Sequence, residues 1–466
     1  MEATNKQIPE NELFKCSTST HLISDCFVNP KHHVEASKHP IFLSPWDLAM
    51  LSVHYIQKGL LFLKPPSPHQ HFSLPSFLQT LKESLSLTLV HFYPLAGRLV
   101  TLNQQSPPSS SVYIDCTRSP GARFIHAAVN LTVSDILSPV DVPVIVQSFF
   151  DHDRAINHDG HTRPLLSVKV TDLVDGVFVG CSFNHAVGDG ESFWMFFNTL
   201  SEIFRAQGGS DFPISRLPIH NQWILNGHGP LLRLPFADED QFLSRHEAPP
   251  LRERIFHFSS QSIAQLKAKA NQENNTDKIS SLQAVSAVVW RCITRARRLP
   301  DEQQTNCRMA ANNRSRMEPP VPKNYFGNCI QVVCASSTAA ELLGGGFGRA
   351  AWLCHRAVGT HTDKVVREWV GGWLESPIVY QLGRLFDPCS VMMGSSPRFD
   401  VYGNEFGIGK AVAVRSGYAN KFDGKVTLYP GREGGGSMDL EICLSPETMA
   451  AFESDREFRD AVWESD

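Results

Sequence analysis

The chain has 466 residues and a net charge of −4, with 42% apolar and 19% charged residues. This composition excludes a disordered chain, and the charge gives no reason to expect nucleic acid or an anionic membrane as a partner. A chain of this length can bury a large core in two or three domains without disulfides or metal ions. No apolar run reaches the ~18 residues of a membrane span, the first fifteen residues are polar, and the eleven cysteines show no paired spacing. We therefore expect a cytoplasmic protein with reduced thiols.

Four segments of the first half show regular patterns. Residues 43–63 begin with a turn and continue as a mostly apolar segment. Residues 77–100 open with apolar residues at helical spacing, and a proline and a glycine then end the helix before an expected strand. Residues 162–183 predict two strands around Asp175-Gly176, which is a strong hairpin signal. Residues 191–206 place five apolar side chains on one helical face, so the segment before them lies between a strand and a helix.

The second half mixes helices and strands in the same way. Residues 207–255 are rich in proline and glycine and lack a steady period, so we interpret them as a long crossover linker. A helix follows at 280–298, with Ser280 as its N-cap and arginines near its C-terminal end. Residues 425–444 predict two strands around a glycine-rich loop. The sequence shows no internal repeat and predicts an α/β (α+β) fold with a sheet and helices in each half.

The stretch NHAVGDG, residues 184–190, places His185 and Asp189 at the junction of a predicted strand and a helix. A histidine at a strand end that opens into a glycine turn can act as a general base. A buried, hydrogen-bonded histidine is the alternative, and the spacing alone does not decide between the two. Asp189 could orient His185 as the acid of a catalytic triad does. Its position directly before a helix favours a structural role, in which it caps the helix or pairs with an arginine.

Two other segments contain residues typical of ligand sites. Residues 151–163 hold three histidines and three aspartates. Their spacing matches no zinc pattern, so we predict a solvated loop with a turn at 158–160 and no metal site. The glycine-rich residues 344–349 lack the lysine and hydroxyl residue of a phosphate-binding loop, and we interpret them as a turn.

Five blocks spread over nearly the whole chain resemble the plant BAHD family of acyl-CoA-dependent acyltransferases. NHAVGDG resembles the HxxxD motif of that family. FYPLAGRL (92–99) resembles the family's N-terminal signature, and NNRSRMEPPVPKNYFGN (312–328) resembles its arginine-proline-YFGN block. NEFGIGK (404–410) resembles its second hallmark, and LYPGREGGGSMDLEICL (428–444) resembles its C-terminal strand pair. Because the blocks occur in the family's order, their joint match is more specific than any single motif.

The resemblance implies a two-domain fold similar to chloramphenicol acetyltransferase, in which each domain is a mixed sheet flanked by helices. The N-terminal domain would span residues 1–206, the linker 207–255 and the C-terminal domain 256–466. A segment near 385–410 would pack with the N-terminal domain. A solvent channel would run between the domains, with acyl-CoA entering from one face and a small-molecule acceptor from the other. The enzyme would be a monomer without a permanently bound cofactor.

The resemblance also implies roles for individual residues. His185 would take a proton from an acceptor hydroxyl or amine, which then attacks the thioester. Asp189 would be structural and would pair with Arg314. The hallmark glycines Gly407 and Gly409 would be structural residues of the active site. The residues beside CoA would be Lys278, Ser280, Ser281 and Asn312. The acceptor pocket would be lined by Ser44, Pro45 and Trp46.

Two hallmark positions depart from the family pattern, since Glu405 stands for the usual Asp and Ile408 for the usual Trp. An indole that donated to the oxyanion would be worth on the order of 10²–10³ in rate. Ser395 and Ser396, just upstream, are alternative donors. The changed block keeps two other functions open, because a fold does not fix a function. One is a lyase or rearrangement enzyme that does not use CoA, and the other is a binding protein without turnover.

Overall fold

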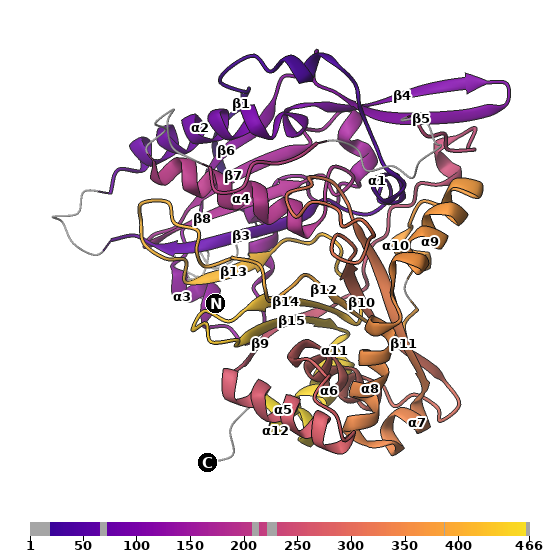
Figure 1. Ribbon diagram of the computed structural model, residues 1–466. Helices are drawn as coiled ribbons and strands as arrows, with labels where there is room; N and C mark the ends of the chain where they lie inside the picture. The colour runs from indigo at the N-terminus through magenta and orange to yellow at the C-terminus, as the bar shows by residue number, and fades with distance from the viewer. Residues whose placement is uncertain (1–18, 66–71, 207–213, 221–230, 386, 463–466) are drawn as a thin grey trace, which may run out of the picture.

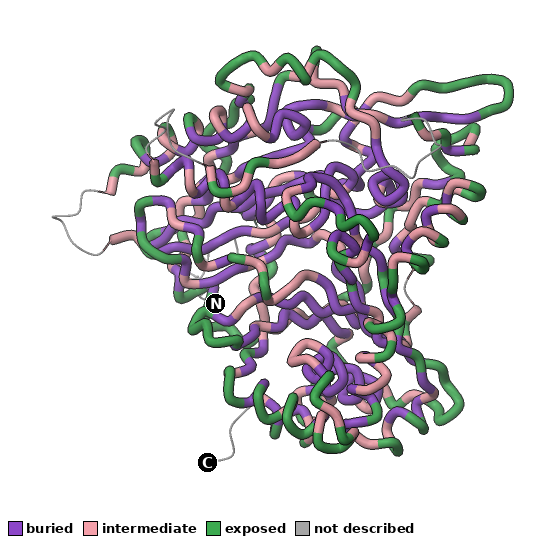
Figure 2. The backbone as a smooth tube through the Cα atoms, in the orientation of Figure 1, coloured by how far each residue is buried: buried purple, intermediate pink, exposed green. Residues whose placement is uncertain are grey.

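The computed structural model describes residues 19–65, 72–206, 214–220, 231–385 and 387–462. These residues form two six-stranded sheets and a small three-stranded sheet. In Figure 1 the indigo-to-magenta part of the chain forms most of one six-stranded sheet and its helices, in the upper half. The orange-to-yellow part forms most of the other six-stranded sheet and its helices, below it. Figure 2 shows buried backbone through the centre of both halves and exposed backbone in the outer helices and loops. Since each sheet is flanked by helices, the predicted two-domain mixed fold is confirmed.

The N-terminal sheet has the strand order β1-β6-β7-β8-β3-β13. On one of its faces α2 and α4 pack against each other, whereas α3 covers the other face. The hairpin predicted around Asp175-Gly176 is confirmed, because β7 and β8 pair antiparallel on either side of it. The elements of this part are β1 (His21–Val28), β3 (Ile56–Leu63), α2 (Leu74–His91), β6 (Ala122–Ala128), α3 (Val133–Leu137), β7 (Leu166–Asp172), β8 (Gly176–Phe183) and α4 (Gly190–Arg205), with β2 (Ile41–Phe42), β4 (Arg98–Gln105) and β5 (Pro108–Asp115) in the small sheet.

The last strand of this sheet comes from near the C-terminal end of the chain. β13 (Ala413–Ser416) pairs antiparallel with β3, so that Val414 lies opposite Leu60. The residues that lead into β13 join the same core, since Phe406 and Ile408 pack in one cluster with α2 and α4. The two domains are therefore interlocked through a segment that leaves the C-terminal sheet, completes the N-terminal one and returns (Figure 1).

The C-terminal sheet has the strand order β11-β10-β12-β14-β15-β9. The helix predicted at 280–298 is confirmed as α6, which begins at an N-cap formed by Ser280, and the strands predicted in 425–444 are β14 and β15. The elements of this part are β9 (Arg252–Phe258), α5 (Ser260–Glu273), α6 (Ser281–Ala296), β10 (Gln304–Asn312), β11 (Ile330–Thr338), α7 (Ala339–Gly344), α8 (Gly346–Gly359), α9 (Asp363–Glu375), α10 (Leu382–Leu385), β12 (Val391–Gly394), β14 (Lys425–Pro430), β15 (Met438–Leu444), α11 (Pro446–Glu453) and α12 (Arg456–Val462).

The two faces of the C-terminal sheet meet different surroundings. On β14, Val426 and Leu428 pack into the core that α6 and α8 share. Side chains alternate along a strand, so Lys425, Thr427 and Tyr429 point to the other face. In Figure 1 the helices α5, α6, α8, α11 and α12 lie below the sheet and the N-terminal domain lies above it. The face of β14 that carries Lys425 is therefore turned toward the N-terminal domain.

Three local features differ from the sequence-based expectations. β9 begins at Arg252, inside the expected linker 207–255, because it pairs with β15. Residues 157–161 form a short 3-10 helix in place of a simple turn. Residues 344–349, predicted as a turn, form the boundary between two helices, since α7 ends at Gly344 and α8 begins at Gly346. Within the expected linker, residues 207–213 and 221–230 lie outside the described part of the chain.

Candidate functional site

His185 lies in the turn that joins β8 to α4. The turn is tight, because Asn184 Oδ1 accepts a hydrogen bond from the Ala186 N–H at 3.0 Å. Position 188 has to be a glycine because the side chain of Ser192 packs against its backbone. A Cβ at position 188 would lie 2.6 Å from the Cβ of Ser192. Asn184 and Asp189 are fully buried, whereas His185 keeps part of its surface accessible. The turn thus presents one side chain, the imidazole, and hides its neighbours.

Side chains from distant parts of the chain hold the backbone of His185. Asn157 Oδ1 accepts from the His185 N–H at 2.7 Å, and Asn328 Nδ2 donates to the His185 carbonyl at 2.7 Å. Asn328 is fixed in turn by Asp47. The Oδ1 of Asp47 accepts from the backbone N–H of Asn328 at 2.9 Å and from its side-chain Nδ2 at 2.8 Å. Both peptide groups of the histidine are therefore clamped, which fixes the position from which the imidazole projects. This is the arrangement that a precisely aimed base requires.

The ring of His185 is largely enclosed by the fold. Its Nδ1 is buried and forms no hydrogen bond with the described residues. Burial lowers the pKa of His185 from its ordinary value of 6.5, and the charge of Lys425 acts in the same direction. Because a lowered pKa keeps the imidazole neutral at neutral pH, the ring is present in the form that accepts a proton.

Asp189 is fully buried, and its carboxylate is occupied by a helix N-terminus and an arginine. It caps α4, because Oδ1 accepts from the Ser192 N–H at 3.1 Å. Arg314 binds both carboxylate oxygens, at 2.7 and 3.1 Å, and the Cys329 N–H donates to Oδ2 at 3.0 Å. Burial by itself would raise the pKa of Asp189, but Arg314 lowers it below its usual range. Among the described residues its partners do not include His185, so these two residues do not form the first link of a catalytic triad.

The NEFGIGK block lies at the other end of α4. Ser201 binds the backbone N–H and carbonyl of Glu405, at 2.9 and 3.0 Å. Twelve residues separate Ser201 from Asp189, which is roughly 18 Å along a helix axis. Ile408 is 8% exposed and packs in the N-terminal core, so at this position the side chain contributes to packing. Gly407 and Gly409 have φ values of +71° and +87°, which favour glycine.

Replacing Gly409 by alanine is expected to lower the free energy of unfolding by about 1–2 kcal/mol, because its left-handed backbone penalises a side chain. A Cβ at Gly409 meets no atom within 4 Å, so the effect is one of the backbone alone. Urea denaturation measures it. Gly371→Ala is the matched control, because that glycine lies inside α9 in equally open space. There alanine is expected to stabilise by about 0.5–1 kcal/mol. An unchanged stability of Gly409→Ala would contradict the assigned backbone effect.

Ser395 and Ser396 directly follow β12, which lies between β10 and β14 in the C-terminal sheet. Both are partly buried, and Ser395 has a φ of +67°, which is unusual for a residue other than glycine. Ser396 Oγ accepts from the Arg398 N–H at 3.2 Å. The preceding Gly394 touches the ammonium of Lys425, since a Cβ on this glycine would lie 2.1 Å from Nζ. Sequence reasoning missed Lys425, which lies in a predicted strand and belongs to none of the local motifs considered.

The four residues expected beside CoA lie in the C-terminal domain. Ser280 is the N-cap of α6, and its Oγ accepts from the Gln283 N–H at 3.3 Å. Ser281 begins the helix and Lys278 is exposed just before it. A helix N-terminus next to a lysine favours an anionic group. Asn312 is exposed at the end of β10, where its Oδ1 accepts from the Arg314 N–H at 3.0 Å.

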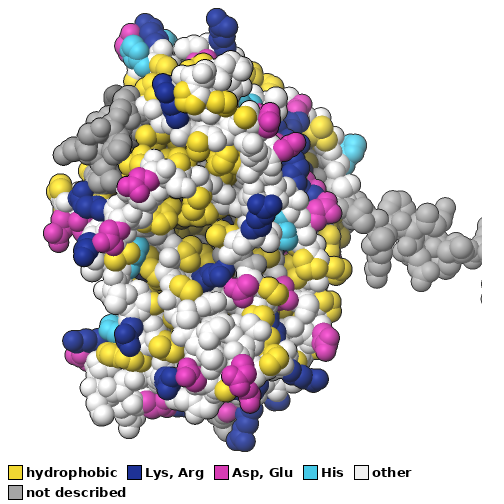
Figure 3. All heavy atoms as spheres, turned by 90° about the vertical axis from the view of Figure 1, so that its right-hand side faces the viewer, with side chains coloured by type: hydrophobic (Ala, Val, Ile, Leu, Met, Phe, Trp, Pro, Cys, Tyr) yellow, Lys and Arg dark blue, Asp and Glu magenta, His cyan; other side chains and the backbone are white. Residues whose placement is uncertain are grey.

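Ser44, Pro45 and Trp46 are all buried in this structure. Ser44 caps α1 (Pro45–Ala49) through a capping box with Asp47, and Trp46 stacks on Trp369 of α9 at 6.3 Å between ring centroids. These residues support the site, since Asp47 holds the asparagine that clamps His185. Their role as the lining of the acceptor pocket stays a prediction. The face of the molecule that carries α9 and α10 is shown in Figure 3, where apolar side chains gather across the middle.

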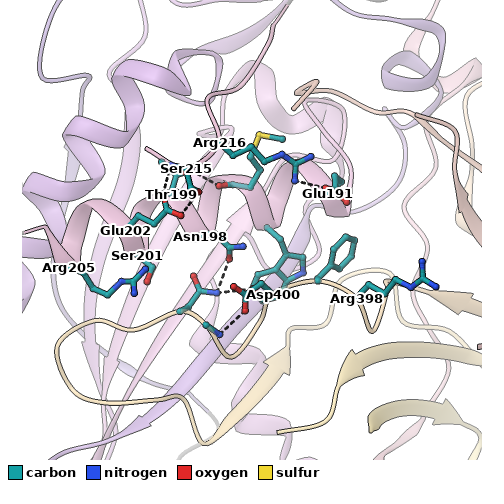
Figure 4. Close-up of a pocket in the computed structure, with 15 residues that line it drawn as sticks. Glu191, Asn198, Thr199, Ser201, Glu202, Arg205, Ser215, Arg216, Arg398 and Asp400 are labelled. Atoms are coloured by element: carbon teal, nitrogen blue, oxygen red, sulfur yellow. Dashed lines mark hydrogen bonds and ion pairs between the residues drawn. The ribbon is translucent and has the colours of Figure 1, made fainter. Parts of the chain in front are cut away.

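A pocket of about 290 Å³ lies on the solvent side of α4, between this helix and residues 398–404 (Figure 4). His185 does not line it. Several of its polar groups are satisfied by one another, because Arg216 pairs with Glu191 at 2.7 Å and Ser215 donates to Glu202. We therefore place the candidate active site at His185 and not in this pocket.

Within the described part of the chain, no group of three or more His, Cys, Asp or Glu side chains is placed to hold a metal ion. In the same residues, no helix has both the length and the apolar character needed to cross a membrane. The histidine-rich residues 151–163 have a different use in the fold, because they supply Asn157 to the clamp on His185.

Comparisons with known proteins agree with this architecture. The family described as "Transferase family" matches residues 20–459. The chain is 37% identical over 444 residues to an uncharacterized acetyltransferase of Arabidopsis thaliana, covering 94% of this chain and 98% of that protein. It is 34% identical over 454 residues to BAHD acyltransferase DCR of the same plant, covering 94% and 92%.

Two solved structures share the fold. Vinorine synthase has a TM-score of 0.72 at 21% identity, covering 95% of this chain and 98% of that one. F. sporotrichioides TRI101, complexed with coenzyme A and T-2, has a TM-score of 0.70 at 18% identity, covering 91% and 98%. The family match spans almost the entire chain, and the resemblance drawn from the five sequence blocks is confirmed: the chain belongs to the BAHD family of acyltransferases.

Proposed function

We propose that this protein transfers an acyl group from an acyl-CoA thioester to a hydroxyl or amine of a small specialised metabolite, with His185 as the general base. The observation that carries this proposal is the clamped, partly accessible imidazole of His185. Its backbone is held on both sides, and burial favours its neutral form. These are the properties of a histidine placed to remove a proton.

The reaction then follows from ordinary acyl-transfer chemistry. Nε2 of His185 takes the proton of the acceptor O–H or N–H as that atom attacks the thioester carbonyl. The tetrahedral intermediate collapses when the C–S bond breaks, and the imidazolium returns its proton to the CoA thiolate. Ser395 and Ser396 are the proposed donors to the oxyanion, and the N-terminus of α6 with Lys278, Ser280, Ser281 and Asn312 is the proposed CoA contact. Asp189 and Arg314 keep the turn in shape, and Gly407 and Gly409 do the same for the hallmark block.

The experiment that tests the proposal measures the release of free CoA thiol. The protein is incubated with acetyl-, malonyl-, benzoyl- or hydroxycinnamoyl-CoA and a pooled panel of phenols, alcohols and amines. We expect release that depends on the acceptor for at least one donor, together with CoA binding by isothermal titration calorimetry. No release with any donor and no CoA binding would overturn the proposal and favour a lyase or rearrangement on the same fold. CoA binding without release would favour a binding protein.

Three sequence-based predictions belong to this proposal. The oligomeric state and the lack of a bound cofactor rest on the family resemblance, and the location rests on the cysteines without paired spacing. We propose that the protein acts as a monomer, that it works in the cytoplasm, and that it carries no permanently bound cofactor. Acyl-CoA would be its co-substrate and a small molecule its acceptor, with no nucleic acid or membrane partner.

A further inference from the structure

Lys425 places a cation on the inner face of the C-terminal sheet. It is the first residue of β14 and points, with Thr427 and Tyr429, toward the N-terminal domain. Its side chain lies across the neighbouring strand β12, where Nζ touches Gly394. Any other residue at 394 would place a Cβ about where the ammonium lies, since even an alanine Cβ would be 2.1 Å from Nζ. The glycine leaves room for the ammonium next to Ser395.

The acids near Lys425 are already used by other cations and donors. Lys421 pairs with Glu253 at 2.5 Å and lies 3.8 Å from Glu441. Glu441 also accepts from Ser416 Oγ at 2.5 Å and from the Tyr429 hydroxyl at 3.3 Å. Lys58 donates to the same tyrosine hydroxyl at 2.6 Å. The two carboxylates thus already accept from Lys421, Ser416 and Tyr429, and Lys58 binds that same tyrosine.

Lys425 is the lysine left without a partner. Within the described part of the chain, its ammonium makes no hydrogen bond or ion pair, although its side chain is partly buried. Burial lowers the pKa of Lys425 to about 8, and the like charge of Lys58 adds to this effect. The side chain is therefore still mostly charged at neutral pH. A partly buried cation without a counterion is costly, and an anionic ligand would relieve that cost.

Lys425 is also close to the chemistry. The glycine that its ammonium touches directly precedes the two serines proposed as oxyanion donors, and its charge contributes to lowering the pKa of His185. A ligand group that meets this ammonium would belong to a molecule whose reacting atoms lie near His185. We propose that Lys425 is a specificity-determining residue that binds a carboxylate carried by a substrate, either by the acyl chain of the donor or by the acceptor. This inference rests on the proposed acyl transfer and names the substrate class it would act on.

The test compares substrates that differ only in a carboxylate. Malonyl-CoA is compared with acetyl-CoA for the donor, and anthranilate and 3-hydroxybenzoate with their methyl esters for the acceptor. Wild type is expected to favour the acid of at least one of these pairs, in kcat/KM or in the Kd measured by calorimetry. In Lys425→Met the preference for the acid is expected to fall about 10- to 100-fold, the range for a lost charge-assisted hydrogen bond. The pair that responds identifies whether donor or acceptor carries the carboxylate.

Two further variants separate the binding role from other effects. Gly394→Ala keeps the charge but displaces the ammonium, so it is expected to reduce the same preference. Lys425→Arg is expected to retain a part of it. Lys364→Met, at an exposed lysine of α9, is the control and should keep both the preference and the rate. Thermal unfolding of each variant shows whether the domain interface is intact.

The outcomes distinguish this inference from the proposed function. Acyl transfer without a Lys425-dependent preference in any pair would overturn the carboxylate role and leave the function in place. An equal loss for acids and esters would also overturn it and assign Lys425 to the oxyanion or the thiolate. If Kd shows a preference for the acid and Lys425→Met abolishes that preference, the carboxylate role is supported even without turnover. In that outcome only the acyl-transfer proposal fails.

Discussion

Replacing His185 by alanine is expected to lower kcat by roughly 10²–10⁴-fold, the contribution of a positioned general base. Asn157 and Asn328 hydrogen-bond to the backbone of His185, so the turn keeps these hydrogen bonds when the imidazole is removed. CoA binding should therefore persist in the variant, and thiol release measures the loss. His39→Ala changes an exposed histidine and serves as the control. A rate within threefold of wild type would remove His185 from the mechanism.

The pH profile gives an independent test of the same residue. The base must be neutral, and burial lowers the pKa of His185 below 6.5. Activity on substrates without a carboxylate should therefore stay level above pH 6.5 and fall only when the pH drops through the lowered pKa. In Lys425→Met the acid limb should move to higher pH, because the ammonium of Lys425 contributes to lowering the pKa of His185. An acid limb above pH 7 in wild type would contradict the environment described for the ring.

Replacing Asp189 by alanine is expected to lower the free energy of unfolding by about 3–5 kcal/mol, because Arg314 would remain buried without its counterion. The variant also loses the cap of α4, which adds about 1 kcal/mol. Urea denaturation followed by circular dichroism measures the change. The remaining activity should follow the folded fraction, since the carboxylate makes no contact with the imidazole.

Two comparisons make this result specific to the buried pair. Glu368→Gln breaks the exposed pair with Lys364 in α9 and is expected to change stability by less than about 0.5 kcal/mol. The double variant Asp189→Ala/Arg314→Met removes both buried charges and should be more stable than Asp189→Ala alone. A double variant as unstable as the sum of two separately measured single variants would contradict the ion-pair explanation.

The sequence predicts well those features that a short stretch of chain decides. The hairpin at Asp175-Gly176 and the N-cap at Ser280 depend on neighbouring residues, and both are confirmed. The capping role of Asp189 follows from its place before an amphipathic helix. The family resemblance then supplied Arg314 as its partner, 125 residues away, which spacing alone does not reveal.

The parts that the sequence did not predict depend on distant contacts. Asn157 and Asn328 bind His185 from positions 28 before it and 143 after it, and an asparagine in a loop carries no signal of such a partner. Lys425 looks like an ordinary strand lysine until the fold places Gly394 under it and leaves the nearby acids to Lys421. Its chemistry comes from what surrounds it and not from the residues beside it in sequence.

The C-terminal part of the chain contributes β13 to the N-terminal sheet, which has a consequence for how the molecule can be divided. The edge of β3 is completed by residues 413–416, so a fragment ending within the linker would leave that edge unpaired. An unpaired edge strand invites association with other chains. The halves of this protein are therefore not independent building blocks that could be exchanged between relatives at the linker. A functional chimera has to take residues 401–416 from the same parent as β3, and the natural unit of recombination is discontinuous in sequence.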